Sequence, residues 1–265
     1  MDELIDGARK GVEDRRREVP QSDLEQRLSG RGEDRPFNEA LVRPGLSVIA
    51  EFKRRSPSVG AIAEDADVAR QVAAYERGGA AAASVLTDAP HFGGSLDDLR
   101  AARAACSIPI IRKDFIIDTY QLYEAAVNGA DAVLLIVRAL DDSALGEMYE
   151  RARGLDLDCL IEVHDGDELE RALRLDADVI GINNRNLDEG TVDVSTTYEL
   201  MPDVPAGKTV VAESGISSRA ELEELERVGV DAVLIGSALM SAADPEALTR
   251  ELTGSDEGTH EHHLP

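Results

Sequence analysis

The chain is poor in cysteine and in aromatic side chains. Its 265 residues include two cysteines, Cys106 and Cys159, no tryptophan, and only 3% aromatic residues. Two cysteines favour reduced thiols over a disulfide framework, and without a cluster of further ligands they do not form a metal site. We therefore expect a cytoplasmic protein without a structural metal.

Positive charge is also scarce. Lysine and arginine number 28 against 53 aspartates and glutamates, so the formal net charge is −25 at pH 7. This balance disfavours nucleic acid and anionic membranes as partners. The acids are spread over helix-like segments instead of forming one block. We therefore favour a chain adapted to high salt over one with an acidic partner-binding surface.

Long hydrophobic runs are missing as well. No apolar stretch reaches the roughly 18 residues that a bilayer span requires. The segment 1–17 is charged and lacks the apolar region of a secretory signal. We expect no membrane association. With 43% hydrophobic residues, the chain can still build the core of one large or two small domains.

Eight short apolar runs alternate with segments of helical periodicity, a pattern typical of buried parallel strands covered by helices. The runs are Ser47–Phe52, Ala82–Leu86, Pro109–Arg112, Ala132–Val137, Cys159–Val163, Val179–Ile182, Thr209–Ala212 and Ala232–Ile235. Eight such units predict an α/β fold, the (β/α)8 TIM barrel. The alternative, an open doubly wound sheet, usually has a glycine-rich turn after its first strand, where this chain has KRRSPS.

The predicted divisions are an N-terminal helical extension (1–45), the barrel (46–253) and a flexible tail (254–265). The extension should hold helices over Glu3–Glu18 and Ser22–Leu28, followed by a loop with Pro36 and Pro44, and lie across one end of the barrel. The polar tail contains the run HEHH, which could bind metal. Because no helix or strand preorganises it, we favour a loose surface tract.

Charged residues follow the predicted strands, at the end where barrel enzymes carry their sites. The first strand stops in Glu51 and Lys53, which point the same way because strand side chains repeat every second residue. Lys113, Glu162 and Glu213 end the third, fifth and seventh strands. Each alone could form a structural ion pair, whereas all together at one mouth favour an active site. Two crowded lysines predict a lowered lysine pKa.

Small-residue turns follow the last two predicted strands. They are Ser214-Gly215 and Gly236-Ser237, each opening a helical segment. Either turn alone could be an ordinary tight connection. The pair predicts a phosphate site and a phosphorylated small-molecule substrate. The sequence has no dinucleotide fingerprint, Walker loop or metal cluster, so we expect the chemistry to use side chains without a cofactor.

The roles of three further residues remain open. His164, two residues after Glu162, is a candidate base, although a histidine at a strand end is more often a structural hydrogen-bonding residue. Phe92 and His91 either cap a substrate ring or fill a turn beside Gly93.

With these residues in view, the chain resembles the indole-3-glycerol phosphate synthase family of tryptophan biosynthesis. The matching stretches are IAEFKRRSPS, SVLTD with HFGGS, PIIRKDFIID, LIEVH, GINNRNL, VAESGI and LIGSALM. The resemblance implies a cofactor-free carboxy-lyase. It would close 1-(2-carboxyphenylamino)-1-deoxyribulose 5-phosphate to indole-3-glycerol phosphate, with loss of carbon dioxide and water. The resemblance also favours a monomer.

The resemblance further implies a role for each site residue. Lys113 is the general acid and Glu162 the general base. Lys53 meets the substrate carboxylate and acts as a second acid in the dehydration. The groups that assist proton transfer, orient the substrate or complete the mouth are Glu51, Asn183, Glu213 and Ser214. Those around the phosphate are Ser56, Arg185, Gly215, Gly236 and Ser237.

Three rival interpretations are kept. Another sugar-phosphate barrel would need one acid and one base. A catalytically silent binding or scaffold barrel would lack charges at the strand ends. Purely structural pairing would turn these charges away from the mouth.

Overall fold

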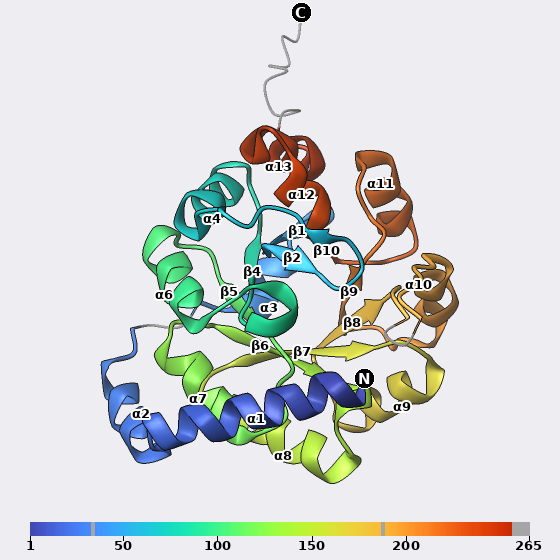
Figure 1. The fold of residues 1–265 in the computed structure, drawn as a ribbon. Coiled ribbons are helices and arrows are strands. Elements are labelled where there is room, and N and C mark those ends of the chain that lie inside the picture. Colours follow the sequence, from blue (N-terminus) through green and yellow to red (C-terminus); the bar gives the residue numbers. More distant parts are fainter. Residues whose placement is uncertain (33–34, 187–188, 256–265) are drawn as a thin grey trace, which may run out of the picture.

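A closed barrel of parallel strands forms the centre of the molecule. The computed structural model describes residues 1–32, 35–186 and 189–255. Within them, eight strands pair in chain order and the last pairs with the first (Figure 1). They are β1 (Ser47–Phe52), β4 (Ala82–Leu86), β5 (Ile110–Lys113), β6 (Ala132–Ile136), β7 (Asp158–Val163), β8 (Val179–Asn183), β9 (Thr209–Glu213) and β10 (Ala232–Ile235). The predicted TIM barrel is confirmed, and the open-sheet alternative is wrong.

Helices cover the outside of the barrel. They are α4 (Val68–Arg77), α6 (Leu96–Ala105), α7 (Thr119–Val127), α8 (Asp142–Arg153), α9 (Gly166–Arg174), α10 (Ser195–Leu200), α11 (Arg219–Arg227), α12 (Ser237–Ser241) and α13 (Pro245–Thr253). Aspartate or serine side chains cap several N-termini, because they accept hydrogen bonds from otherwise unpaired backbone N–H groups. Asp118 and Ser218 each form a full capping box. None of the described helices is long and apolar enough to cross a membrane.

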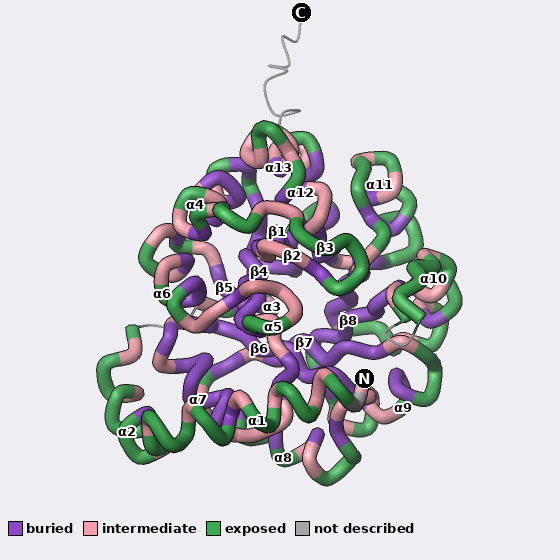
Figure 2. Tube along the Cα trace, in the orientation of Figure 1, coloured by how far each residue is buried: buried purple, intermediate pink, exposed green. Residues whose placement is uncertain are grey.

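Two apolar cores follow from the alternation of side chains along each strand. The larger core lies between the strands and the surrounding helices and includes Val48, Val133 and Ile180. The second core fills the barrel interior and includes Ile49 and Leu160. The strands are therefore buried on both faces, whereas the helices alternate between buried and exposed residues (Figure 2).

A short helix closes the end of the barrel at which the strands begin. In α3 (Phe37–Leu41), the side chains of Phe37 and Leu41 are fully buried in the inner core. Ser47 Oγ donates to the Leu41 carbonyl at 2.8 Å, and the Asn38 N–H donates to Asp158 Oδ2 at 3.0 Å. The sequence predicted a loop here, because five residues between prolines are too few to show a helical period.

The N-terminal helix lies at the opposite end, where the strands stop. Helix α1 (Asp2–Glu18) is followed by α2 (Gln21–Arg27) and the 3-10 turn η1 (Leu28–Gly30), which pack along α7 (Figure 1). Leu4 reaches the inner core at the mouth. Arg15 forms a two-pronged ion pair with Glu124 of α7, at 2.6 and 3.1 Å. The start of α1 thus lies at the mouth, whereas α3 of the same extension closes the other end of the barrel.

Small elements at the mouth were not predicted. A two-stranded antiparallel ribbon, β2 (Arg55–Ser56) and β3 (Gly60–Ala61), follows β1. The short helix α5 (Ala89–Phe92) follows β4, and single 3-10 turns, η2 (Val137–Ala139) and η3 (Met201–Asp203), follow β6 and α10. The predicted tail lies almost wholly outside the described residues, and with it the HEHH run.

Candidate active site

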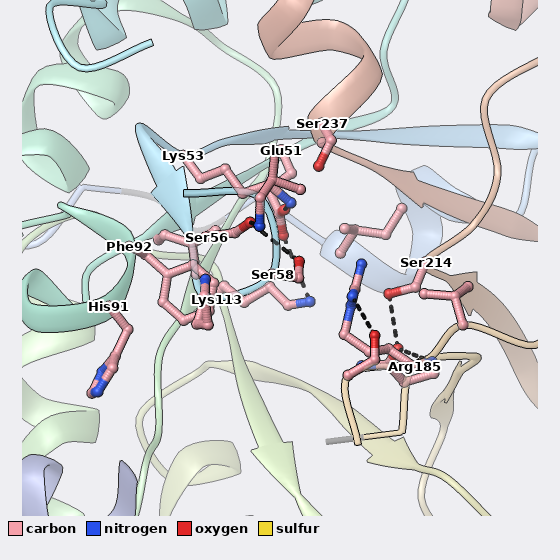
Figure 3. Close-up of a pocket in the computed structure, with 18 of the residues that line it drawn as sticks. Glu51, Lys53, Ser56, Ser58, His91, Phe92, Lys113, Arg185, Ser214 and Ser237 are labelled. Atoms are coloured by element: carbon pink, nitrogen blue, oxygen red, sulfur yellow. Dashed lines mark hydrogen bonds and ion pairs between the residues drawn. The ribbon is translucent and has the colours of Figure 1, made fainter. Parts of the chain in front are cut away.

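A cavity of about 1190 Å3 opens at the ends of the barrel strands. All but one of the residues predicted for the site line it. They are Glu51, Lys53, Ser56, Lys113, Glu162, Asn183, Arg185, Ser214, Gly215, Gly236 and Ser237. Figure 3 shows several of these side chains converging from different strands. The predicted residue that does not line the cavity is Glu213, which is buried behind Lys113.

Lys113 lies at the centre of three carboxylates. Its Nζ donates to Glu213 Oε2 at 2.6 Å, and lies 3.6 Å from Glu51 Oε2 and 3.9 Å from Glu162 Oε2. These carboxylates come from β9, β1 and β7, so three separate strand ends meet at one ammonium group. The interpretation that the charges pair away from the mouth is therefore wrong.

Lys53 forms a second pair at the same mouth. Its Nζ donates to Glu51 Oε1 at 2.7 Å, so Glu51 is shared by both lysines. Gly236 leaves room for this pair: a Cβ there would lie 2.4 Å from Glu51 Oε1 and 2.9 Å from Lys53 Nζ. Gly236, directly after β10 and beside β1, thus leaves the space that this ion pair occupies.

The carboxylates reverse the predicted direction of the lysine pKa. Burial alone would lower the pKa of Lys113, but Glu213, Glu51 and Glu162 outweigh burial and raise it. The expectation that Lys53 would lower this pKa is wrong, because three carboxylates lie within 3.9 Å of the Lys113 ammonium and their attraction determines the direction of the shift. Burial would likewise raise the pKa of Glu51, but Lys53 and Lys113 together lower it.

Glu213 is the carboxyl with the opposite shift. Burial raises its pKa to about 7, with Lys113 opposing the shift. Glu213 Oε1 is buried without a hydrogen-bond partner among the described residues. It packs over Gly181 of β8, where a Cβ would lie 2.5 Å from this oxygen. A titratable carboxyl with a pKa near neutrality is therefore hydrogen-bonded to the central lysine.

Asn183 organises the polar rim between β8 and β9. Its Oδ1 accepts from Ser214 Oγ at 2.9 Å and from the Arg185 N–H at 3.0 Å. Ser214 and Gly215 both have positive φ, 67° and 79°. Two consecutive left-handed residues turn the backbone sharply and can present N–H groups to an anion. Ser56 and Ser237 also line the cavity (Figure 3).

An apolar wall faces the charges and was not predicted as a unit. Phe92 on α5 lies with its ring centroid 6.4 Å from that of Phe115, and Leu134 and Leu234 line the cavity beneath. The two-residue period of a strand would have predicted two of these residues. Phe115 lies two positions after Lys113, and Leu234 lies two positions before Gly236. Of the two positions left open for Phe92, the structure shows the first: Phe92 lines the cavity.

Two other polar residues at the strand ends do not line the cavity. Arg112 is 1% exposed and binds Thr87, Asp114, Glu124 and the Gln121 carbonyl. His164 is held by Glu168 and does not line the cavity. Among the described residues, no group of three or more His, Cys, Asp or Glu could hold a metal ion.

The barrel and its mouth define a class of protein. Paired lysines and carboxylates supply acid–base groups, a wall of phenylalanines suits a planar ring, and left-handed turns after β9 suit an anion. These are the features of a TIM-barrel enzyme acting on a phosphorylated aromatic compound.

Comparison with known proteins identifies the family. The model of the indole-3-glycerol phosphate synthase family matches residues 1–252. The chain belongs to this family of carboxy-lyases in tryptophan biosynthesis, which close 1-(2-carboxyphenylamino)-1-deoxyribulose 5-phosphate to indole-3-glycerol phosphate with loss of carbon dioxide and water. The predicted family and activity are confirmed, and the sugar-phosphate and scaffold alternatives are wrong.

Individual relatives align with this chain over nearly its full length. Indole-3-glycerol phosphate synthase 1 of Streptomyces coelicolor is 45% identical over 97% of this chain and 96% of its own. The enzyme of Rhizorhabdus wittichii is 45% identical over 95% of this chain and 97% of its own.

Solved structures at low sequence identity share the fold. Thiamine phosphate pyrophosphorylase from Pyrococcus furiosus has a TM-score of 0.60 at 21% identity, covering 80% of this chain and 96% of that one. For 3-hexulose-6-phosphate synthase from Salmonella typhimurium the TM-score is 0.62 at 14% identity, covering 79% of this chain and 97% of that one.

Proposed function

We propose that Lys113 is the general acid and Glu162 the general base of ring closure in this chain. The observation that carries the assignment is the position of the Lys113 ammonium, within 4 Å of Glu213, Glu51 and Glu162 at the cavity mouth. No other described cation of the cavity contacts three carboxylates.

In the proposed first step, the ring carbon that carries the carboxylate bonds to the keto carbon of the ribulose chain. Lys113 donates a proton to the keto oxygen and stabilises its developing negative charge. Because its pKa is raised, Lys113 enters the reaction as a cation over the whole working pH range. Glu213, with a pKa of about 7, is the neighbour from which Lys113 can recover a proton.

In the proposed later steps, Lys53 binds the substrate carboxylate until it leaves as carbon dioxide and then protonates the departing hydroxyl as a second acid. Glu162 removes a proton from the ring CH2 group next to the nitrogen, so that the carbon–carbon double bond of the indole forms as the hydroxyl leaves as water, and Glu51 assists because it contacts both lysines. Asn183 and Ser214 orient the substrate through their mutual hydrogen bond. The reacting ring lies against Phe92 and Phe115.

The phosphate is proposed to bind at the rim, opposite the apolar wall. The residues assigned to it are Ser56, Arg185, Gly215, Gly236 and Ser237, with Glu213 completing the floor of the site. In support, the five rim residues line one cavity with the acid–base groups, and Ser214 and Gly215 have left-handed backbone.

Replacing Lys113 by methionine tests the assignment. We expect Lys113→Met to lose roughly three orders of magnitude in kcat, because the developing oxyanion loses its cation. Turnover is followed by the fluorescence of the indole product, and affinity for indole-3-glycerol phosphate, measured by calorimetry, should change little.

Lys208→Met is the matched control. Lys208 immediately precedes β9 at the opposite end of the barrel and binds Asp176 there. The Lys208→Met variant should keep normal turnover. Near-normal turnover in Lys113→Met would refute the general-acid assignment.

The setting of the enzyme is also part of the proposal. We infer a cytoplasmic monomer with a barrel over 46–253, an N-terminal helical extension over 1–45 and a tail over 254–265. We further infer adaptation to high salt, which the net charge of −25 supports. Light scattering of the purified chain would detect a dimer and refute the monomer.

A further inference from the structure

We infer that His164 is a positioning residue for Glu162, fixing one carboxylate oxygen so that the other faces Lys113 and the cavity. The inference rests on the proposed role of Glu162 as base. It assigns to His164 a function beyond the structural hydrogen bond that a histidine at a strand end usually makes.

The contact between the two side chains is direct. His164 Nε2 lies 3.3 Å from Glu162 Oε1, while Glu162 Oε2 lies 3.9 Å from Lys113 Nζ. The His164 side chain is 4% exposed, and its Nε2 is buried without a well-aligned hydrogen bond in this structure. A buried ring nitrogen aimed at one oxygen of the carboxylate leaves only the other oxygen for the reaction.

The far side of the ring is anchored. Glu168 Oε2 lies 2.9 Å from His164 Nδ1 and also accepts the His164 backbone N–H at 2.9 Å. Arg138 of η2 donates to Glu168 Oε1 at 2.7 Å and approaches Asp165 at 3.4 Å. This sequence of contacts sets the orientation of the imidazole from the outside of the barrel.

The charges around the ring favour its cation. The groups that face it are Glu162 on its own strand, Glu168 and Asp165 at the start of α9, and Arg138 on η2. Burial lowers the pKa of His164 and Arg138 opposes the cation as well, but Glu168 and Glu162 outweigh them and raise it. A cationic imidazole carries a proton on both ring nitrogens, so its Nε2–H faces Glu162 Oε1 while Nδ1 faces Glu168.

Glu162 is one of the groups that raise the pKa of His164. A change at Glu162 should therefore be visible in the titration of His164, whereas the contact of Nδ1 with Glu168 should remain.

Asparagine at position 164 separates the two contacts. Its amide can keep the hydrogen bond to Glu168, but it has neither the Nε2 atom nor the charge beside Glu162. In His164→Asn we expect kcat to fall about tenfold, because Glu162 Oε1 is no longer held and the base is less well oriented. KM for the substrate should change less than about threefold, because the phosphate end is untouched.

Arg171→Gln is the control for general damage to α9. Arg171 binds Asp142 and the carbonyls of Val137 and Leu140, away from Glu162. Arg171→Gln should lower stability without lowering kcat. An unchanged kcat in His164→Asn would overturn the inference.

A second measurement does not depend on turnover. The chain has five histidines, so histidine-selective NMR follows each titration, and the signal lost in His164→Asn identifies His164. In Glu162→Gln, the pKa of His164 should fall by about one unit. An unchanged His164 titration there would also overturn the inference, even if His164→Asn failed to fold.

The same Glu162→Gln variant separates this inference from the proposed function. Loss of turnover in that variant supports Glu162 as base, and near-normal turnover refutes it. The His164 titration reports the coupling in either case.

Discussion

Glu213 takes part in the proposed catalysis and also affects the stability of the folded protein. Its folded pKa, about 7, lies above the ordinary value of 4.5, because burial outweighs the attraction of Lys113. Between these two values the folded protein binds more protons than the unfolded chain. The stability contributed by this group is therefore fully present below about pH 4.5 and is lost as pH rises through 7.

Replacing Glu213 by glutamine removes this pH dependence. Between about pH 5 and about pH 8, the free energy of unfolding of the native chain should fall relative to that of Glu213→Gln, by roughly 2–3 kcal/mol. Urea denaturation of both proteins at each pH provides the comparison. A stability difference that stays constant with pH would contradict the raised pKa of Glu213.

The identities of the charged residues could be predicted from the sequence, but their energetics could not. Glu51, Lys53 and Lys113 were predicted because strand period and strand ends are local patterns. The direction in which the pKa of Lys113 shifts depends on distances across the barrel. Lys113 Nζ lies 2.6 Å from Glu213 Oε2, and no local sequence pattern predicts that distance.

At the scale of elements, α1 is attached to the barrel by one buried carboxylate. Glu124 of α7 accepts from Arg15 on one side and contacts fully buried Arg112 at 3.3 Å on the other. Arg112 in turn holds Asp114, next to the central lysine. The N-terminal helix and the end of β5 thus share a network of ion pairs.

Replacing Arg15 by alanine should lower the free energy of unfolding by about 1–2 kcal/mol, because Glu124 stays buried with one partner fewer. Arg9→Ala on the same helix is the control. Its pair with Asp6 is exposed at both ends, 61% and 73%, so it should have almost no effect. Equal effects of the two substitutions in urea titrations would refute a specific anchoring role for Arg15.

Long repeating elements could be predicted and short ones could not. Strands β1, β4 and β10 have the predicted boundaries, since apolar runs are clear over such lengths. Helix α3 and the β2–β3 ribbon lack a period, and tertiary contacts define them: Phe37 fills the barrel floor, and Arg55 pairs with Ala61.

At the scale of the whole molecule, net charge dominates. A charge of −25 on one barrel produces self-repulsion that salt screens. We expect the melting temperature to rise by roughly 10 °C or more between about 0.1 M and about 2 M KCl. Sorbitol at matched osmolality is the control for non-ionic effects. An equal melting temperature at both KCl concentrations would refute adaptation to high salt.

The aromatic lining of the cavity has a spectroscopic consequence. Phe92, Phe115 and His91 surround the place of the ring, and the chain contains no tryptophan. The indole group of the product is therefore the only indole in the complex, and its emission reports the cavity when it is excited at wavelengths longer than the five tyrosines absorb. Quantum yield and lifetime of the bound product can then follow release directly, in real time and without a label.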